Sequence, residues 1–154
     1  MHEKLLKIQQ DLHVPKSRKN TFGGYNYRSC EDIVEAVKPL AASEGFYLIL
    51  TDEVVDVGGR LFIKATAKLL DGQSAFTADG WAEIAPEKKG MDVAQITGAA
   101  SSYARKYALN GLLAIDDVQD ADATNTHDKE PKKVSGTKID YPEPPEIDPQ
   151  DIPL

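Results

Sequence analysis

The chain has 154 residues, a formal net charge of −7 and a single cysteine, Cys30, which excludes an intrachain disulfide and fits a reducing cytosol. The histidines at positions 2, 13 and 127 are too scattered for a metal site. The sequence has no long apolar run, and its charged, amphipathic start differs from a signal peptide, so no membrane span is expected.

The acidic charge is concentrated in the last part of the chain. Residues 1–115 contain 14 Lys/Arg and 14 Asp/Glu, whereas residues 116–154 contain 4 Lys/Arg and 11 Asp/Glu. The first part is therefore neutral, and the second carries the whole charge of −7. A neutral domain still binds a polyanion if its cations cluster, because salt limits the reach of distant acids to roughly 8–10 Å.

Two helices are predicted in the first third of the chain. Apolar residues three and four positions apart predict a helix over residues 2–13, which Pro15 ends. The pattern "SCED" has the form of a capping box, so a second helix is expected to begin near Ser29 and to stop at Gly45. Pro39 lies inside this second helix and is expected to kink it.

Alternating apolar residues and glycine-containing turns predict a three-stranded antiparallel meander. Its strands are expected over residues 46–57, 60–70 and 73–86. Gly58-Gly59 and Asp71-Gly72 are turn signals between these strands, and Gly80 predicts a bulge in the third strand.

A long helix is predicted over residues 91–110, with Gly111 as its C-terminal cap. Its buried face is expected to contain Val93, Ile96, Thr97, Ala100, Ala104, Tyr107 and Ala108. The fold class is therefore α+β, with the long helix packed across the meander. Residues 1–117 are expected to form one domain. Residues 118–154 are expected to be a mostly disordered acidic tail, since they hold too little apolar surface to offset the entropy of ordering.

The segment from Lys16 to Ser29, "KSRKNTFGGYNYRS", combines cations, aromatic rings and a glycine pair without any acid. Cations neutralise phosphates, rings stack on unpaired bases, and glycine lets the backbone approach a strand closely. The residues expected to contact nucleic acid here are Lys16, Arg18, Lys19, Phe22, Gly23, Gly24, Tyr25, Tyr27 and Arg28. The alternative is that Phe22 and Tyr27 anchor the core and the glycine pair is only a turn. Composition alone does not favour nucleic acid over this alternative.

A run of small residues from Gly98 to Ser102 lies in the predicted long helix and lets another structure come close. Arg105 follows Ser101 and Ser102 by four and three positions, so these side chains are placed to share an anion. A helix dipole also favours anions near the start of a helix. The further cations expected to contribute are Lys88, Lys89 and Lys106. The alternative is ordinary packing of a helix on a sheet, with solvated cations.

Few features of this sequence indicate catalysis. It has no Ser-His-Asp order, metal-ligand cluster or nucleophile elbow, so no catalytic residue, metal or cofactor is predicted. Asp116 and Asp117 suit Mg²⁺, but the pattern favours the alternative that they are the start of the acidic tail. A docking peptide is indicated by the acidic run that ends in Asp151, Ile152, Pro153 and Leu154. The alternative is a solubilising tail.

Two segments carry a family resemblance: "NTFGGYNYRSCEDIVEAVKPL" and "GMDVAQITGAASSYARKYALNGLLAIDD". They resemble the two signature segments of the essential recombination function (ERF) family, which are single-strand annealing proteins, largely of phages and prophages. The resemblance covers about residues 1–117. It implies a β-β-β-α core, ATP-independent pairing of complementary strands, and assembly of copies into rings or filaments. The family positions fall on Phe22, Gly23, Gly24, Tyr25, Tyr27 and Arg28, and on Ser101, Ser102, Tyr103, Arg105, Lys106 and Tyr107.

The last residues resemble the acidic tip of bacterial single-stranded DNA-binding proteins, with Leu154 where that tip has Phe. The predicted function is therefore non-enzymatic binding and annealing of single-stranded DNA in phage-type recombination, in the host cytoplasm and away from membranes. The predicted partners are single-stranded DNA, further copies of the chain, and a host single-stranded DNA-binding protein or the proteins that bind it. One alternative is an adapter whose tail recruits host replication or repair proteins. Another is a metal-dependent nuclease that uses Asp116 and Asp117.

Overall fold

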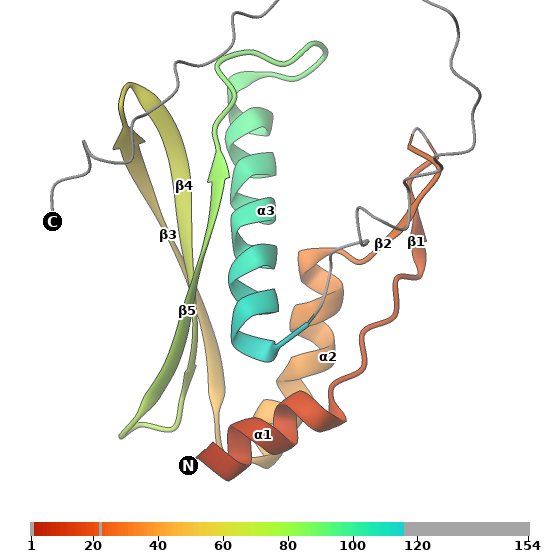
Figure 1. Cartoon of the computed structure of the whole chain (residues 1–154), viewed down its shortest axis with the longest axis vertical. Helices are drawn as coiled ribbons and strands as arrows, with labels where there is room; N and C mark the ends of the chain where they lie inside the picture. Colours follow the sequence, from red (N-terminus) through yellow and green to blue (C-terminus); the bar gives the residue numbers. More distant parts are fainter. Residues whose placement is uncertain (1, 22, 116–154) are drawn as a thin grey trace, which may run out of the picture. The chain divides into compact units, whose positions relative to one another are not determined.

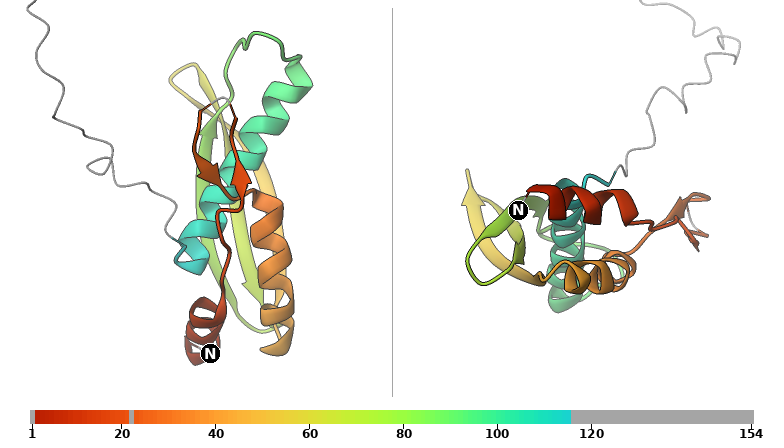
Figure 2. Two further views of the ribbon diagram at one scale, coloured as in Figure 1. Left: turned by 90° about the vertical axis from the view of Figure 1, so that its right-hand side faces the viewer. Right: turned by 90° about the horizontal axis from the view of Figure 1, so that it is seen from below.

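The computed structural model describes residues 2–21 and 23–115 (Figure 1). Its elements are α1 (His2–Asp11), β1 (Arg18–Lys19), β2 (Asn26–Tyr27), α2 (Cys30–Ser43), β3 (Tyr47–Val57), β4 (Arg60–Leu70), β5 (Ala75–Glu83) and α3 (Val93–Leu113). The helices of these residues lie on one side of a three-stranded sheet, and α3 runs along that face (Figures 1 and 2). This α+β arrangement is the predicted one. The sites predicted at Phe22 and in residues 116–154, including Asp116, Asp117 and the four terminal residues, lie outside the described residues.

The sheet is the predicted antiparallel meander, in the order β3-β4-β5. Val57 pairs with Arg60 across the first turn, where Gly58 and Gly59 both have positive φ angles, 63° and 84°. Glycine adopts this left-handed conformation without the steric cost that other residues incur, and successive positive φ angles are typical of tight hairpin turns.

The bulge predicted at Gly80 is wrong, because Gly80 pairs with Ala65 in an unbroken register. The glycine serves the approach of α3 instead. A Cβ atom at Gly80 would lie 2.2 Å from the backbone oxygen of Ala104 and 2.3 Å from the backbone nitrogen of Ala108. The strand and the helix therefore touch backbone to backbone at this point.

Helix α3 begins with a capping box between Asp92 and Gln95 and continues to Leu113. The predicted stop at Gly111 is wrong, because Leu112 and Leu113 are both buried and their packing extends the helix past the glycine. The chain leaves the helix at Ala114, which has a left-handed φ of 54°. Such a residue commonly ends a helix, although it is usually glycine.

The predicted buried face of α3 is correct at Ile96, Ala100, Ala104 and Ala108, and Thr97 is half-buried. It is wrong at Val93, the first residue of the helix, whose side chain is 80% exposed. It is also wrong at Tyr107, which is 46% exposed, because the contact with β5 leaves no room for a ring.

Helix α2 begins at Ser29 with the predicted capping box, formed with Asp32, and runs through Pro39 without a break. It ends before Gly45, which has the positive φ expected of a helix stop. Helix α1 is shorter than predicted and ends at Asp11. The core that unites these helices with the sheet contains Ile8, Ile33, Val37, Phe46, Leu69 and Leu109.

The segment between α1 and α2, where no strand is predicted from the sequence, forms a short hairpin. Arg18 pairs with Tyr27, and Lys19 pairs with Asn26, in antiparallel register. The hairpin projects away from the sheet on the side of α2 (Figures 1 and 2). Within the described ranges, no helix combines the length and apolarity needed to cross a membrane.

Candidate nucleic-acid interface

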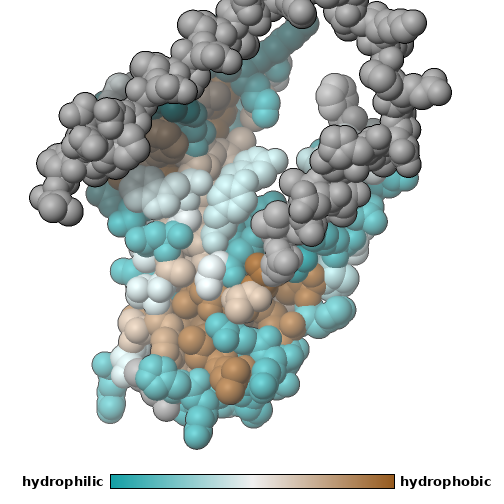
Figure 3. Space-filling view, viewed as in Figure 1, coloured by the Kyte–Doolittle hydropathy of each residue, from teal (hydrophilic) through white to brown (hydrophobic). Residues whose placement is uncertain are grey.

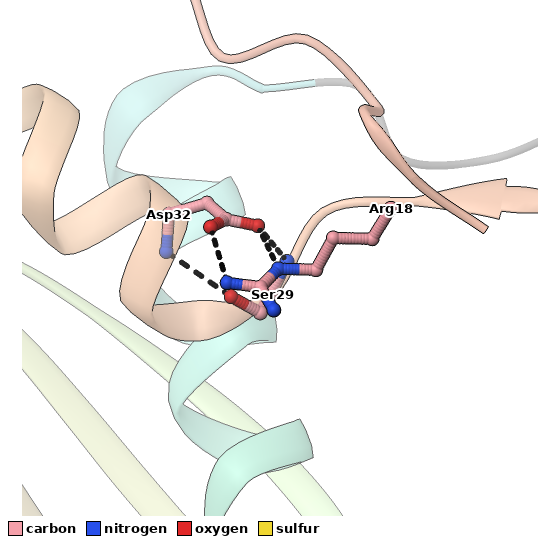
Figure 4. A network of polar contacts seen from close by, with 3 residues as sticks. All are labelled: Arg18, Ser29 and Asp32. Atoms are coloured by element: carbon pink, nitrogen blue, oxygen red, sulfur yellow. Dashed lines mark hydrogen bonds and ion pairs between the residues drawn. The ribbon is translucent and has the colours of Figure 1, made fainter. Parts of the chain in front are cut away.

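The hairpin is fastened to the start of α2 by one carboxylate. Arg18 donates from Nε and from a terminal guanidinium nitrogen to the two oxygens of Asp32, at 2.7 and 2.8 Å (Figure 4). Asp32 also accepts from the backbone nitrogen of Ser29 at 2.8 Å, which completes the capping box. The hydrogen bonds from Arg18 and Ser29 hold the pKa of Asp32 well below its usual range. Arg18, predicted as a phosphate ligand, is thus engaged within the chain.

The tyrosines of the hairpin are on its surface. Tyr25 and Tyr27 are 44% and 36% exposed, and their ring centroids lie 6.4 Å apart. The alternative of a core anchor is therefore wrong for Tyr27. Asn20 positions the first ring, because its Nδ2 donates to the Tyr25 hydroxyl at 3.0 Å and its Oδ1 accepts from the Gly23 nitrogen at 3.0 Å.

The glycine pair lets the Tyr25 ring fold back onto the turn. A Cβ at Gly23 would lie 2.4 Å from Cε1 of Tyr25, so the ring rests directly on this backbone. Gly24 has a φ of 70°, a left-handed conformation that glycine adopts without steric cost. The pair therefore shapes how the aromatic side chains are presented.

The hairpin and α3 meet at a small hollow of about 180 Å³, here called the hairpin hollow. Its lining consists of Tyr27, Arg28, Ser29, Cys30, Glu31, Ser102, Tyr103 and Lys106. Residues from both predicted nucleic-acid segments thus lie on one surface. Partial burial, with the nearby charge of Glu31, raises the pKa of the Cys30 thiol, so this group is neutral at physiological pH.

The anion predicted to lie between Ser101 and Arg105 is a carboxylate of the chain itself. Ser101 Oγ donates to Asp52 at 2.6 Å, and Arg105 Nε donates to Asp52 at 2.9 Å. Partial burial opposes ionisation of Asp52, but these hydrogen bonds and the charge of Arg105 hold its pKa below the ordinary value. Ser102 instead lines the hairpin hollow.

Sequence reasoning missed Asp52 because it lies on β3, 49 residues from Ser101. Asp52 pairs with Ala65 of β4, which is buried. Paired residues point to the same side of a sheet, so Asp52 faces α3. The signal was the inward position of an acid in an alternating strand.

Lys106 lies beside two exposed rings of its own helix. Its Nζ is 5.2 Å from the ring centroid of Tyr103 and 5.8 Å from that of Tyr107. Attraction of a cation to the face of an aromatic ring is stabilising at such distances. This places positive charge and aromatic faces together on the exposed side of α3.

The remaining predicted cations are spread around this surface. Lys19 is exposed on β1, Lys16 is half-buried before it, and Lys89 is exposed in the turn before α3. Lys88 lines a second and larger hollow, of about 440 Å³, between β5 and α3. Tyr103 is part of the lining of both hollows, so the two are neighbours on the surface of α3.

Trp81 is a residue of this surface that sequence reasoning left unassigned. It is 45% exposed and borders the larger hollow. The signal that could have found it is its place next to Gly80: a glycine facing inward at a helix crossing puts the following side chain on the outer side of the strand.

Within residues 2–21 and 23–115, no group of three or more histidines, cysteines or acids is arranged to hold a metal ion. The ERF superfamily model matches residues 1–141. The essential recombination function protein of Salmonella phage P22 is 47% identical over 150 residues, which is 95% of this chain and 72% of the phage protein. No solved structure matches. The match of the family model to residues 1–141, with the relative aligned over most of both chains, shows that this chain belongs to the ERF superfamily.

Proposed function

We propose that this chain is a non-enzymatic, ATP-independent protein of phage-type recombination that binds single-stranded DNA and anneals complementary strands. The observation that carries the proposal is the hairpin hollow, where Tyr27 and Arg28 of one segment lie beside Ser102 and Lys106 of the other. Cation, hydroxyl and ring in one place are the groups that bind phosphate and unpaired bases. Membership of the ERF superfamily and the name of the phage P22 relative support a role in recombination.

The proposed phosphate ligands are Lys16, Lys19, Arg28 and Lys106, with Lys88 and Lys89 as further contacts. Arg18 and Arg105 are held by Asp32 and Asp52, so we assign them the task of positioning the hairpin and α3. Neutralising the phosphates of one strand reduces its repulsion of a second, which favours pairing.

Each chain offers only a few cations, so affinity is expected to come from several copies on one strand. A ring or filament of copies would join their surfaces into one continuous binding surface. Once one copy holds the strand, contact of the same strand with the next copy is intramolecular and costs less entropy. Binding should therefore strengthen steeply with oligonucleotide length.

The charge on Lys106 provides the first test. Lys106→Ala is expected to weaken single-strand binding. It should also make the negative slope of log affinity against log salt shallower by about 0.7, the contribution of one phosphate contact, for each chain bound. Lys68→Ala is the matched control, since Lys68 lies on β4 between the buried residues Ala67 and Leu69 and so faces away from α3. Fluorescence anisotropy of a labelled oligonucleotide across a salt series measures both variants. Equal slopes for the two variants would contradict the assignment of Lys106.

The annealing step is tested separately with two complementary oligonucleotides and the full chain without ATP. We expect acceleration over the spontaneous rate. Absence of acceleration, with binding intact, would leave a single-strand binding protein and remove the annealing function. Degradation of the strands in the presence of Mg²⁺ would instead favour the nuclease alternative.

A further inference from the structure

The larger hollow lies between β5 and the N-terminal half of α3, and it is here called the α3–β5 cleft. Its lining consists of Trp81, Ala82, Glu83, Ala85, Lys88, Ile96, Ala99, Ala100, Tyr103 and Tyr107. We propose that the α3–β5 cleft takes unpaired nucleobases of a bound single strand, which stack on Tyr103 and Tyr107, with Trp81 at the outer edge of the cleft beside Lys64. This proposal rests on the proposed function and gives that function its base-contact site.

The aromatic side chains of the cleft are exposed for a structural reason. Ala100, Ala104 and Ala108 take up the inner side of α3, because Gly80 brings the strand against the helix backbone. Large side chains on α3 must then lie beside this contact. Tyr103 and Tyr107 are 50% and 46% exposed, with ring centroids 6.1 Å apart. Exposed apolar area gathered in one place, and rimmed by polar groups, marks a binding surface.

Figure 3 agrees with this distribution. Residues of intermediate hydropathy cross the middle of the face over β5 and α3, and apolar residues lie both above and below them. Tyrosine and tryptophan have this intermediate character, since they combine a large ring with one polar group. A nucleobase, which is flat, polarisable and polar at its edges, suits such a surface better than an aliphatic side chain does.

The charges around the cleft fit a polyanion. Lys88 is part of its lining, and Lys106 lies over both tyrosine rings. The acid in the lining, Glu83, forms an ion pair with Arg60 of the neighbouring strand, so its charge is balanced within the protein. A cationic rim around aromatic faces is the arrangement that holds single-stranded nucleic acid.

The cleft also continues the proposed phosphate-binding surface. Tyr103 borders both the hairpin hollow and the cleft, and its helix neighbours Ser102 and Lys106 line the first of these. A strand whose phosphates follow Arg28 and Lys106 can therefore place bases over Tyr103. At about 440 Å³ the cleft falls in the range of roughly 300–1,000 Å³ typical of sites for small ligands.

Trp81 is the single tryptophan of the chain and borders the cleft on β5, so its emission reports on a strand that is bound along this edge. The full chain is titrated with oligothymidylate and with an abasic oligonucleotide of equal length, which has the phosphates and sugars but no bases. Anisotropy of an end label measures binding, and tryptophan emission measures contact at the cleft. We expect quenching by the oligothymidylate and no quenching by the abasic strand at matched saturation.

The variant Tyr107→Ala should reduce the affinity for oligothymidylate roughly fivefold or more, the equivalent of one lost stacking contact, while the affinity for the abasic strand is unchanged. Tyr107→Phe keeps the ring and should bind like the unmodified chain. The control for loss of an exposed ring is Tyr47→Ala, because Tyr47 is 51% exposed on β3, outside both hollows.

Binding of both strands without any base-dependent change in Trp81 emission would overturn the cleft as a base site and leave the proposed function intact. Emission that changes with protein concentration and ignores DNA would also overturn it, by showing that a second copy covers the cleft. Failure of both strands to bind would defeat the proposed function itself, so the two failures are distinguishable.

Discussion

Gly80 shows how a single missing side chain sets the position of the proposed binding surface. Its backbone meets Ala104 and Ala108 so closely that no Cβ fits, and this contact fixes the height of α3 above the sheet. The same contact keeps Tyr107 at the surface. At the scale of the residue, the contact at Gly80 therefore determines both the packing of α3 on the sheet and the exposure of Tyr107.

Gly80→Ala is expected to lower the free energy of unfolding by roughly 3 kcal/mol, because backbone atoms of α3 must move to admit the methyl group. Gly98→Ala is the control, because Gly98 lies on the exposed side of α3. Nothing lies within 4 Å of a Cβ at this helical glycine, so alanine should stabilise α3 by about 0.5–1 kcal/mol. Urea unfolding followed by circular dichroism measures both changes. If both substitutions changed the free energy of unfolding in the same direction, the close contact at Gly80 would not determine the packing of α3 on the sheet.

At the scale of the element, the hairpin depends on its attachment to α2. Two paired residues on each side form a very short ladder, and a hairpin of this size has little stability of its own. Asp32 supplies the attachment, since it binds Arg18 of β1 and closes the capping box of α2 at the same time. The order of the hairpin and the start of α2 are thus coupled through one side chain.

Asp32→Asn is expected to lower stability by about 1 kcal/mol at neutral pH, the usual effect of weakening a helix cap. The folded-state pKa of Asp32 lies below its unfolded value, so its contribution is complete above the unfolded value of about 3.9 and is lost as pH falls through the folded one. The difference between the two proteins should therefore begin to shrink near pH 4. Unfolding curves between pH 7 and pH 3 measure it, and a difference that stays constant over this range would contradict the ion pair.

Trypsin gives an independent measure of the hairpin. Cleavage at Lys16, Lys19 and Arg28 should be faster in Asp32→Asn than in Ser29→Ala, because only the first variant releases Arg18 from α2. Equal cleavage rates would indicate that the hairpin is held by other contacts.

Elements with local signals were predictable from the sequence. The capping box of α2, the glycine turns and the alternating strands all depend on residues close together in the chain, so α2 and the meander were correctly placed, and α3 was misplaced only at its ends. The errors arose where distant contacts decide the outcome. Burial of Leu112 extends α3 past Gly111. Gly80 is required by the close approach of α3, which comes later in the chain. Asp52 of β3 accepts a hydrogen bond from Arg105 of α3.

The sequence predicted which segments contribute to the candidate site, but it did not predict which contacts their side chains make. Cations and rings marked both segments, but the sequence could not distinguish Lys106, which lines the hairpin hollow beside two tyrosine rings, from Arg105, which is bound to a carboxylate. Side-chain partners of this kind depend on the approach of β3 to α3, which no local pattern encodes.

At the scale of the whole molecule, the charge is divided between a neutral part with clustered cations and an acidic part. Residues 1–115 contain equal numbers of acids and bases, and residues 116–154 carry the whole charge of −7. An acidic segment tethered to a cationic surface is present at high effective concentration, so it competes with any polyanion for that surface. The chain is thereby predicted to regulate its own affinity for DNA.

Deletion of residues 118–154 is expected to raise the affinity for single-stranded DNA, and most strongly at low salt, where electrostatic competition is least screened. A chain of full length with the acids of this segment changed to Asn and Gln is the control, because it removes the charge and keeps the length. Anisotropy titrations at low and at physiological salt measure all three proteins. Both variants should exceed the unmodified chain by the same factor at low salt, and the three should converge as salt rises. An affinity at low salt that neither variant changes would refute the competition, and a rise in the deletion alone would assign the effect to the bulk of the segment instead of its charge.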